Sequence, residues 1–252
     1  MGIQGLLPLL RSIEDSVHIS HYKNQRVGVD TYCWLHKGVY SCSTDLCLGR
    51  ATDRYIEFCL KRVRLLLHHR VIPVMIFDGG KLPQKMEKEK ERESKRAAYK
   101  EKGLMSLAEG NATAANNCFQ HAVDVTPLMA SKLIKKLKEM DVECIVAPYE
   151  ADSQLAFLSK TDQIQCVISE DSDLLTFGCK RVLFKMDEQG HGKEIRLKNL
   201  GAVTDVNFVN WSHEMIQEMC VLSGCDYVQS IPGVGLKRAY QLMRDFKDAK
   251  RA

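Results

Sequence analysis

The amino-acid sequence predicts an α/β fold with a mainly parallel central sheet flanked by helices. Short apolar runs, typical of buried parallel strands, alternate with segments whose apolar residues repeat at helical spacing. Four of the apolar runs are followed closely by acidic residues. The chain has 252 residues, 45% of them hydrophobic and 27% charged, so it can bury a substantial core without disulfides or metals.

Four segments have the composition of buried strands, namely residues 26–29, 71–77, 144–147 and 166–169. Parallel strands of such a sheet end at the same edge, where ligands bind. An acid after one strand commonly forms a turn or caps a helix, but four cases in succession predict that the carboxylates converge. The acids that follow these strands are Asp30, Asp78, Glu150, Asp152, Glu170, Asp171 and Asp173.

Two segments between the strands are expected to be amphipathic helices. Residues 52–68 repeat apolar side chains at helical spacing. Thr126 is a candidate N-cap, Pro127 occupies the first helical position, and apolar residues follow on one face. Strands that alternate with helices in this way indicate a parallel sheet.

A basic helix is expected at residues 84–102. The segment consists of helix-forming residues with almost no apolar face, so it is expected to project into solvent and to be poorly ordered alone. Lys88, Arg92, Arg96 and Lys100 form a basic stripe at four-residue intervals. Two interpretations stay open: an exposed charged helix, or an arm that closes over a phosphate backbone. The second is favoured because the segment follows a strand that ends in acid.

A hairpin near the C-terminus has the features of a nucleic-acid-binding motif. The pattern Pro-Gly-x-Gly-x-Lys at 232–237 opens a predicted helix and resembles the helix–hairpin–helix motif. Gly233 and Gly235 would allow backbone N–H groups to approach a phosphate. Lys237 and Arg238 would add phosphate contacts that do not depend on base sequence.

The charge distribution is uneven, although the net charge is only +4. Residues 81–102 and 236–252 each carry a surplus of +4, which leaves the rest of the chain weakly acidic. This favours a polyanionic partner held around an acidic centre, with solvated surface helices as the alternative. The sequence lacks a membrane span, a signal peptide and the Cys/His spacing of a zinc site, so its ten cysteines are expected to be reduced thiols in an intracellular protein.

Converging carboxylates predict a site for hard cations. Two unit charges ~4 Å apart repel by about 4 kcal/mol at an effective dielectric constant of 20, so the site must take up protons or cations. Oxygen ligands without His or Cys select Mg²⁺ or Mn²⁺, and the number of acids favours two ions. Two ions can act on the attacking and leaving oxygens of a phosphoryl group. The predicted chemistry is metal-dependent hydrolysis of a phosphodiester.

Six stretches of the chain carry a family resemblance. They are MGIQGLLPLL at 1–10, VDTYCWLHKG at 29–38, IFDGG at 76–80, APYEADSQLAFL at 147–158, ISEDSDLLTFGC at 168–179 and LSGCDYVQSIPGVGLKRA at 222–239. In this order they resemble the structure-specific 5′ nucleases of the flap endonuclease and xeroderma pigmentosum G superfamily. Asp152, where flap endonucleases typically have Glu, and the Trp-Leu-His-Lys run at 34–37 favour the exonuclease branch.

The resemblance implies a PIN-like 5′ nuclease fold with a projecting helical arch and a C-terminal helix–hairpin–helix. It implies two Mg²⁺ ions, with Mn²⁺ as a substitute. Lys85 and Arg92 match arch residues that steady the scissile phosphate, and Asp78 and Asp173 are expected to be catalytic with them. The implied metal ligands are Asp30, Asp78, Glu150, Asp152, Asp171, Asp173 and Asp226.

Further DNA contacts are implied by the same resemblance. Tyr32 and His36 match a wedge that meets the duplex at a junction. Alternatively, Tyr32 is a core residue and His36 is a residue on the helix surface. A K⁺ or Na⁺ ion at the hairpin would use Ser223, Ser230 and the backbone of Val234. The implied DNA contacts are Gly2, Tyr32, His36, Arg96, Lys185, Ser230, Gly233, Gly235, Lys237 and Arg238.

A single nuclease domain is expected to span residues 1–252. It would comprise an N-terminal region at 1–99, with the arch beginning in 81–102, an internal region at 138–229, and the helix–hairpin–helix at 223–247. Because the family's nuclease core usually extends further, a C-terminally shortened chain is expected. The family's long tail, with its motifs for mismatch-repair partners and nuclear import, would then be missing.

The expected activity is a Mg²⁺-dependent 5′→3′ exonuclease on double-stranded DNA with 5′ flap endonuclease activity, in mismatch repair and end resection in the nucleus. The expected partners are DNA with nicks, gaps, recessed 5′ ends or 5′ flaps, and mismatch-repair proteins. A monomer without membrane association is expected. Three alternatives stay open: a dedicated flap endonuclease, a non-catalytic DNA-junction binder and a PIN-type ribonuclease. The binder is disfavoured because repulsive acids do not help to bind a polyanion.

Overall fold

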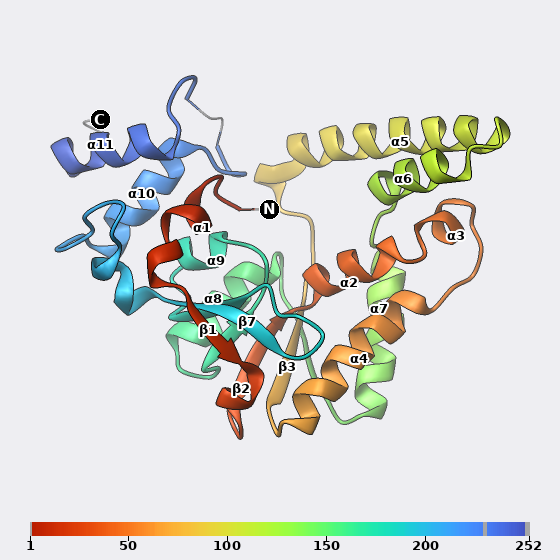
Figure 1. The fold of residues 1–252 in the computed structure, drawn as a ribbon, viewed down its shortest axis with the longest axis horizontal. Helices are drawn as coiled ribbons and strands as arrows, with labels where there is room; N and C mark the ends of the chain where they lie inside the picture. The colour runs from red at the N-terminus through yellow and green to blue at the C-terminus, as the bar shows by residue number, and fades with distance from the viewer. Residues whose placement is uncertain (1, 229–230, 250–252) are drawn as a thin grey trace.

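The computed structural model describes residues 2–228 and 231–249, which form one sheet with helices on both faces (Figure 1). The strand order is β1-β7-β6-β5-β2-β3-β4. Neighbouring strands from β6 to β4 run parallel, whereas β7 is antiparallel to β6 and β1. The strands are β1 (Asp15–His18), β2 (Arg26–Asp30), β3 (Ile72–Phe77), β4 (Glu143–Val146), β5 (Cys166–Ile168), β6 (Arg181–Phe184) and β7 (His191–Arg196).

The prediction of a mainly parallel sheet is confirmed, and so is the neighbourhood of the four acid-ending strands. These strands lie side by side in the order β5-β2-β3-β4. Asp30 pairs in register with Ile76, two residues before Asp78, so both acids lie at the same edge. The helices are α1 (Leu6–Leu9), α2 (Thr31–Tyr40), α3 (Ser43–Cys47), α4 (Arg54–His68), α5 (Met86–Ala108), α6 (Ala112–Ala122), α7 (Pro127–Glu139), α8 (Ala151–Lys160), α9 (Asp173–Thr176), α10 (His213–Ser223) and α11 (Leu236–Phe246).

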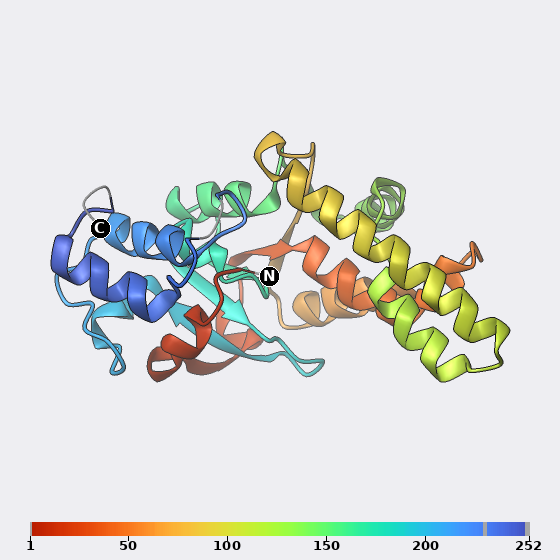
Figure 2. The same cartoon turned by 90° about the horizontal axis from the view of Figure 1, so that it is seen from above.

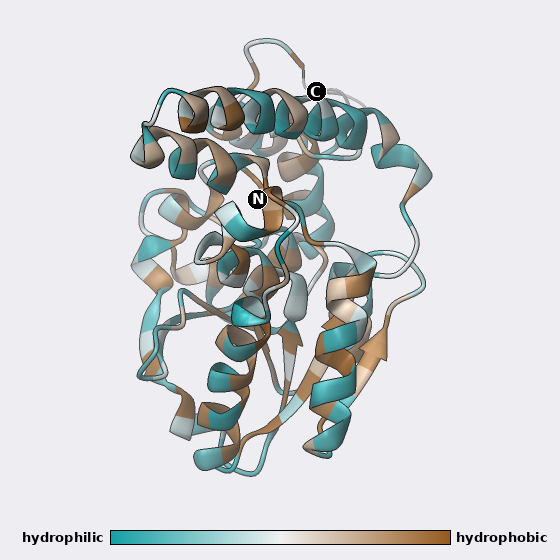
Figure 3. Cartoon of the chain, turned by 90° about the vertical axis from the view of Figure 1, so that its right-hand side faces the viewer, coloured by the Kyte–Doolittle hydropathy of each residue, from teal (hydrophilic) through white to brown (hydrophobic). Residues whose placement is uncertain are grey.

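Two hydrophobic clusters hold the sheet between its helical layers. Val29 and Met75 point to the cluster formed with α2, α4 and α7, whereas Val74 and Ile76 point to the cluster formed with α8, α9 and α10. This alternation follows from the two-residue period of a strand. Figure 3 shows the strands as mostly hydrophobic and the outer helices as mixed. Each fully buried Val, Ile or Met side chain contributes about 1.5–3 kcal/mol to the stability of the fold. This core therefore fixes the strand ends that carry the acids.

Both amphipathic helices expected from the sequence are present. Residues 52–68 correspond to α4, and α7 begins at Pro127. The hydroxyl of Thr126 accepts a hydrogen bond from the N–H of Met129 at 3.3 Å, which is the predicted N-cap.

The basic helix is longer and better packed than the sequence predicts. It continues to Ala108 as α5 and lies antiparallel beside α6, which the sequence pattern did not reveal (Figure 2). Gly103 allows the close approach, because a Cβ there would lie 2.6 Å from Cε1 of Phe119. The expectation that this helix does not pack is therefore wrong for the second half of α5. The first half faces the edge of the sheet.

The described helices include none that is long and apolar enough to cross a membrane. All ten cysteines are free, and eight of them are buried. They serve as small core residues, as expected from the sequence.

Gly79 lets the chain after β3 pass close to the chain after β4. Its N–H donates a hydrogen bond to the carbonyl oxygen of Tyr149 at 2.6 Å. A Cβ at this position would lie 1.9 Å from the carbonyl oxygen of Ala147, so backbone would have to move. The residue before this crossing is Asp78, whose position therefore depends on it.

Replacing Gly79 by Ala is expected to lower the free energy of unfolding by about 3 kcal/mol, because the added methyl group has no space. Urea denaturation of the original protein and of the Gly79→Ala variant measures this difference in the free energy of unfolding. Gly201→Ala is the control, since a Cβ there has no neighbour within 4 Å. Equal unfolding midpoints for the two variants would contradict the prediction.

Candidate active site

The carboxylates that follow the four strands gather at one edge of the sheet. Asp30 is the N-cap of α2, where its Oδ1 accepts from the N–H of Cys33 at 3.3 Å. Its Oδ2 accepts from the hydroxyl of Ser169, at the end of β5, at 2.7 Å. Oδ1 of Asp78 accepts from the N–H of Ala151, at the start of α8, at 2.7 Å. These bonds link the ends of neighbouring strands through the acids themselves.

The remaining acids come from the starts of α8 and α9. Glu150 is the N-cap residue of α8, with Asp152 in its first turn. Oδ1 of Asp171 accepts from the N–H of Asp173, the first residue of α9, at 2.9 Å. Asp30, Asp171 and Asp173 are buried.

The acids of the cluster lie close enough to shift one another's pKa values. Burial raises the pKa of Asp152 well above its usual value, and the charges of Asp30, Asp171, Asp78 and Glu150 raise it further. Acids from all four strand ends therefore lie close enough to interact. Such a cluster is stable at neutral pH only with bound protons or cations.

Burial and neighbouring charges also raise the pKa of two other acids to about 6. For Asp78, burial is opposed by the hydrogen bond from Ala151 and supported by Asp30 and Glu150. For Asp173, burial acts together with the charges of Asp171 and Asp226. Burial likewise raises the pKa of Asp171, although the hydrogen bond from the N–H of Asp173 opposes it.

The donor set fits hard divalent cations. All its side chains offer oxygen, which is what Mg²⁺ and Mn²⁺ prefer. Oδ1 of Asp173 is buried without a hydrogen-bond partner, so this oxygen is available to bind a cation. Within the described residues, however, no three His, Cys, Asp or Glu side chains are already arranged to hold a metal ion. The acids of the neighbouring strand ends converge, whereas the binding of cations by them stays a prediction.

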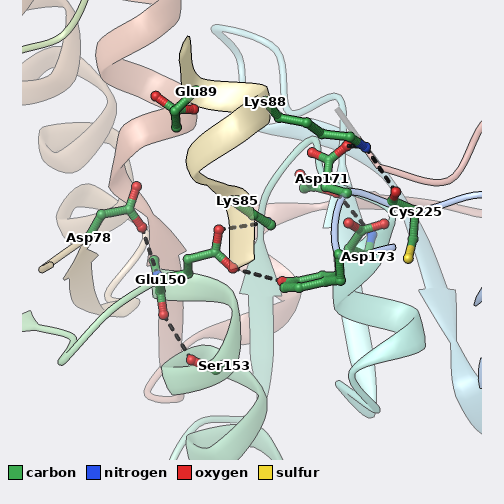
Figure 4. A network of polar contacts seen from close by, with 12 residues as sticks. Asp78, Lys85, Lys88, Glu89, Glu150, Ser153, Asp171, Asp173 and Cys225 are labelled. Carbon is green, nitrogen blue, oxygen red and sulfur yellow. Dashed lines mark hydrogen bonds and ion pairs between the residues drawn. The ribbon is translucent and has the colours of Figure 1, made fainter. Parts of the chain in front are cut away.

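Basic side chains of the arch lie among these carboxylates (Figure 4). Nζ of Lys85, in the short 3₁₀ helix Pro83–Lys85 before α5, lies 2.6 Å from Oε1 of Glu150. The hydroxyl of Tyr227 donates to Oε2 of the same carboxylate at 2.7 Å. The ring of Tyr227 also packs against the ammonium, which lies 4.2 Å from its centre. Lys85 is thus held between a carboxylate and an aromatic face.

Asp226, in the loop between α10 and α11, is bound by two cations of α5. Nζ of Lys88 lies 2.8 Å from its Oδ1, and a guanidinium nitrogen of Arg92 lies 2.9 Å from its Oδ2. Burial would raise the pKa of Asp226, but Lys88, Arg92 and Lys85 outweigh it and hold the pKa below its usual range. Three arch cations therefore partly neutralise the cluster in this structure.

The basic stripe of the sequence includes Lys88 but does not place it at the carboxylates, and no sequence pattern revealed Tyr227. Lys88 lies three residues after Lys85 and four before Arg92, so the three cations share one face of the helix. That spacing could have singled out Lys88. Nothing comparable marked Tyr227, since its role depends on how the loop after α10 folds back.

Gly2 lies against the cluster. Its φ is +92°, and a Cβ would lie 2.6 Å from Oδ1 of Asp171 and 2.3 Å from the hydroxyl of Ser172. Only glycine fits there.

Tyr32 and His36 lie on the face of α2 beside the cluster. Tyr32 is partly buried, and burial, Asp78 and Asp124 raise its pKa. Burial lowers the pKa of His36, so its ring is neutral at pH 7. The two ring centres are 6.4 Å apart. Neither residue is wholly a core residue, so both keep a surface that a ligand can meet.

The other implied contacts lie on separate elements. Arg96 pairs with Asp124 at 3.3 Å under the arch. Lys185 is exposed and follows β6. The hydroxyl of Ser223 donates to the carbonyl of Cys220 at 2.8 Å, and Ser230 lies outside the described residues.

The hairpin before α11 has the expected turn. The N–H of Val234 donates to the carbonyl of Ile231 at 3.1 Å, and Gly233 has a φ of +78°. Gly235 is the N-cap of α11, and its backbone is extended. Lys237 and Arg238 are exposed. α11 packs on α10 (Figure 1), and Asp226 lies in the loop between these two helices.

The raised pKa of Asp173 predicts a stability that depends on pH. Its pKa is about 6 in the folded protein, above the ordinary value of 3.8, so its stabilising contribution is complete below pH 4 and is lost as pH rises through 6. A difference of about two pKa units corresponds to about 3 kcal/mol. In a chelator at pH 7, Asp173→Asn should unfold at a higher urea concentration than the original protein, and the difference should vanish at pH 4. A difference that does not depend on pH would contradict this.

Comparison with known proteins identifies the family to which this fold belongs. Two family models match the chain, the XPG N-terminal domain over residues 1–99 and the XPG I-region over residues 141–226. Together they cover most of the chain, which belongs to the XPG family. The resemblance indicated by the motifs is confirmed.

Curated relatives point to one branch of this family. Exonuclease 1 of Arabidopsis thaliana is 51% identical over 251 residues, which is 100% of this chain and 34% of the relative. Exonuclease 1 of Danio rerio is 49% identical over 244 residues, which is 97% of this chain and 30% of the relative. The chain thus spans about a third of the length of these relatives.

Solved structures confirm the fold. The catalytic core of Rad2 in complex with DNA substrate superposes with a TM-score of 0.74 at 20% identity, over 98% of this chain and 69% of that one. The Holliday junction-resolving enzyme GEN1, in complex with product DNA and a Mg²⁺ ion, gives a TM-score of 0.64 at 19% identity, over 97% of this chain and 51% of that one. The 5′ nuclease fold predicted from the sequence is therefore correct.

Proposed function

We propose that this chain is the nuclease region of a Mg²⁺-dependent 5′→3′ exonuclease that degrades double-stranded DNA and also cuts 5′ flaps. One observation carries the proposal. Acids from the ends of four neighbouring parallel strands act on one another at a single edge of the sheet, and the basic arch faces them. The Exonuclease 1 relatives, which share about half of the residues, support the exonuclease branch.

The proposed metal ligands are the seven carboxylates of the cluster. Two Mg²⁺ ions bound there would supply a nucleophile at neutral pH and stabilise the charge that develops on the scissile phosphodiester. Asp30, Asp78 and Asp171 are held in place by hydrogen bonds from neighbouring strand and helix ends. The ligands are Asp30, Asp78, Glu150, Asp152, Asp171, Asp173 and Asp226.

The chain's own cations would position the phosphate. Lys85 is oriented toward the cluster by Glu150 and Tyr227, and Arg92 lies two turns further along the same face. A guanidinium can contact two phosphate oxygens at once, whereas an ammonium acts as a point charge. Both residues would stabilise the additional negative charge of the transition state.

The duplex would lie across the edge of the sheet between α2 and the hairpin. Tyr32 and His36 present rings at one side of the cluster, and Lys237 and Arg238 present charge at the other. Gly233 opens the turn before α11, where backbone N–H groups and a K⁺ or Na⁺ ion would contact phosphate. Because these contacts meet ring faces and phosphates, recognition would depend on DNA shape and ends. Arg96, Lys185 and Gly2 complete the proposed set of contacts.

We propose four further properties together with this function. They are a nuclear location, a role in mismatch repair and end resection, a monomeric state and binding of mismatch-repair proteins. They follow from the kinship with Exonuclease 1, a name that describes proteins about three times as long as this chain.

The test is a comparison of three labelled substrates with and without Mg²⁺: a duplex with a recessed 5′ end, a duplex with a long 5′ flap, and a matched RNA duplex. The proposal predicts Mg²⁺-dependent release of 5′-mononucleotides from the recessed end and slower cutting of the flap. Faster cutting of the flap would make the chain a flap endonuclease. Binding without cleavage would make it a junction binder, and cleavage of RNA alone a ribonuclease.

A further inference from the structure

Asp226 is held differently from Asp30, Asp78 and Asp171. Asp30, Asp78 and Asp171 accept hydrogen bonds from neutral N–H or hydroxyl groups. Both oxygens of Asp226, by contrast, are bound by the cations of Lys88 and Arg92. A carboxylate so neutralised attracts a further cation less strongly.

Lys88 is anchored at this place by a second contact. Its ammonium also donates to the backbone carbonyl of Cys225 at 2.8 Å, so two oxygens from the loop after α10 hold it. Its side chain is 41% exposed, whereas that of Lys85 is 13% exposed and covered by Tyr227. Lys88 is therefore open to solvent, and its ion pair costs less to break than that of the enclosed Lys85.

Arg92 is also paired with carboxylates of the protein in this arrangement. One nitrogen of its guanidinium lies 2.9 Å from Asp226 and another 2.9 Å from Oε1 of Glu89. Both ends of the fork are occupied by acids of the protein, so Arg92 must release at least one of them to bind a phosphate.

We propose that Lys88 is a positioning residue that serves as an internal counter-ion for Asp226 and holds the first turns of α5 over the carboxylates until a divalent cation displaces it. The inference rests on the metal site of the proposed function. It goes beyond that function because it couples two events: cation binding at Asp226 releases Lys88 and Arg92, which are then free for phosphate. By reciprocity, DNA that draws these cations away strengthens metal binding to the same degree.

The direct test is a Mn²⁺ titration of the metal-free protein without DNA, followed by electron paramagnetic resonance. Lys88→Met should bind its weakest Mn²⁺ ion about two- to five-fold more tightly than the original protein, the range expected for removing a partly exposed ion pair. Lys88→Arg should restore the original affinity, because it keeps the charge. Lys95→Met is the matched control: it also breaks one ion pair of α5, with Glu91, but does not touch Asp226.

Unchanged or weaker Mn²⁺ binding by Lys88→Met would overturn the proposal, and so would equal gains in Lys88→Met and Lys95→Met. Lys88→Gln serves as a second neutral variant if Lys88→Met fails to fold, and the same gain is required of it. Because this titration contains no DNA, it tests Lys88 at the metal site without requiring that the chain cut DNA.

A second measurement tests the coupling itself. Ca²⁺ serves as a hard cation, and the affinity for a fluorescent duplex with a recessed 5′ end is compared in Ca²⁺ and in chelator. The original protein should gain more DNA affinity from Ca²⁺ than Lys88→Met gains, because the variant has no ammonium to release. Equal gains in the two proteins would contradict the proposed coupling.

Discussion

Replacing Asp171 by Asn is expected to reduce the rate of DNA cleavage by about 10³-fold or more, because the metal site supplies several kcal/mol of transition-state stabilisation. Asp171 is buried, and its Oδ1 is oriented by the N–H of Asp173. Asn keeps the shape and that hydrogen bond but carries no charge to hold a cation. The cleavage rate under single-turnover conditions and the DNA affinity in chelator separate chemistry from binding.

DNA affinity should change little in the same variant, since the phosphate contacts come from the arch and the hairpin. Asp162→Asn is the control: Asp162 pairs with Lys180 at 2.6 Å and belongs to no part of the cluster. A cleavage rate that is equal in the two variants would show that the carboxylates are not the catalytic groups.

Replacing Lys85 by Met is expected to lower the single-turnover rate by about 10²–10³-fold, the usual loss when one preorganised charge at the reacting group is removed. Lys85 is the most enclosed of the arch cations, between Glu150 and the ring of Tyr227. Met retains the apolar stem against that ring but loses the ammonium. The measurement is the cleavage rate at saturating enzyme, with melting temperature as a check on folding.

Two further variants help to interpret the result for Lys85→Met. Arg92→Met should show a loss of similar size, because both cations would contact the phosphate. Tyr227→Phe keeps the ring over Lys85 and removes only the hydroxyl that donates to Glu150, so a smaller loss of about tenfold is expected, the value of one ordinary hydrogen bond. If Lys85→Met retained nearly full activity while Tyr227→Phe lost it, Lys85 would be a structural counter-ion for Glu150.

Four of the five parallel strands could be predicted from the sequence because strand and acid occur together, whereas β6 was not predicted. Apolar runs ending at Asp30, Asp78 and Asp171 gave both the strands and the edge at which they meet. The antiparallel pair β1 and β7 was not predicted, because neither is a continuous apolar run: β1 reads Asp-Ser-Val-His. Polar edge strands lack the pattern on which the prediction depends.

The packing of the arch could not be predicted for a similar reason. The charged half of α5 dominates its composition, whereas the contact with α6 depends on Gly103, a residue that usually argues against a helix interior. The ion pairs of the acidic cluster could not be predicted from the sequence either. Converging acids were foreseen, but the ion pairs of Lys85, Lys88 and Arg92 with them require the arch to fold back over the edge.

The most direct test of the whole account is the number of Mn²⁺ ions bound at pH 7 by the metal-free chain and by its Asp171→Asn/Asp173→Asn double variant. The account predicts two ions for the original chain and loss of at least one of them in the variant, with the fold retained in circular dichroism. Equal binding by both proteins, or no binding by either, would contradict the claim that this edge of the sheet is a metal-dependent catalytic centre.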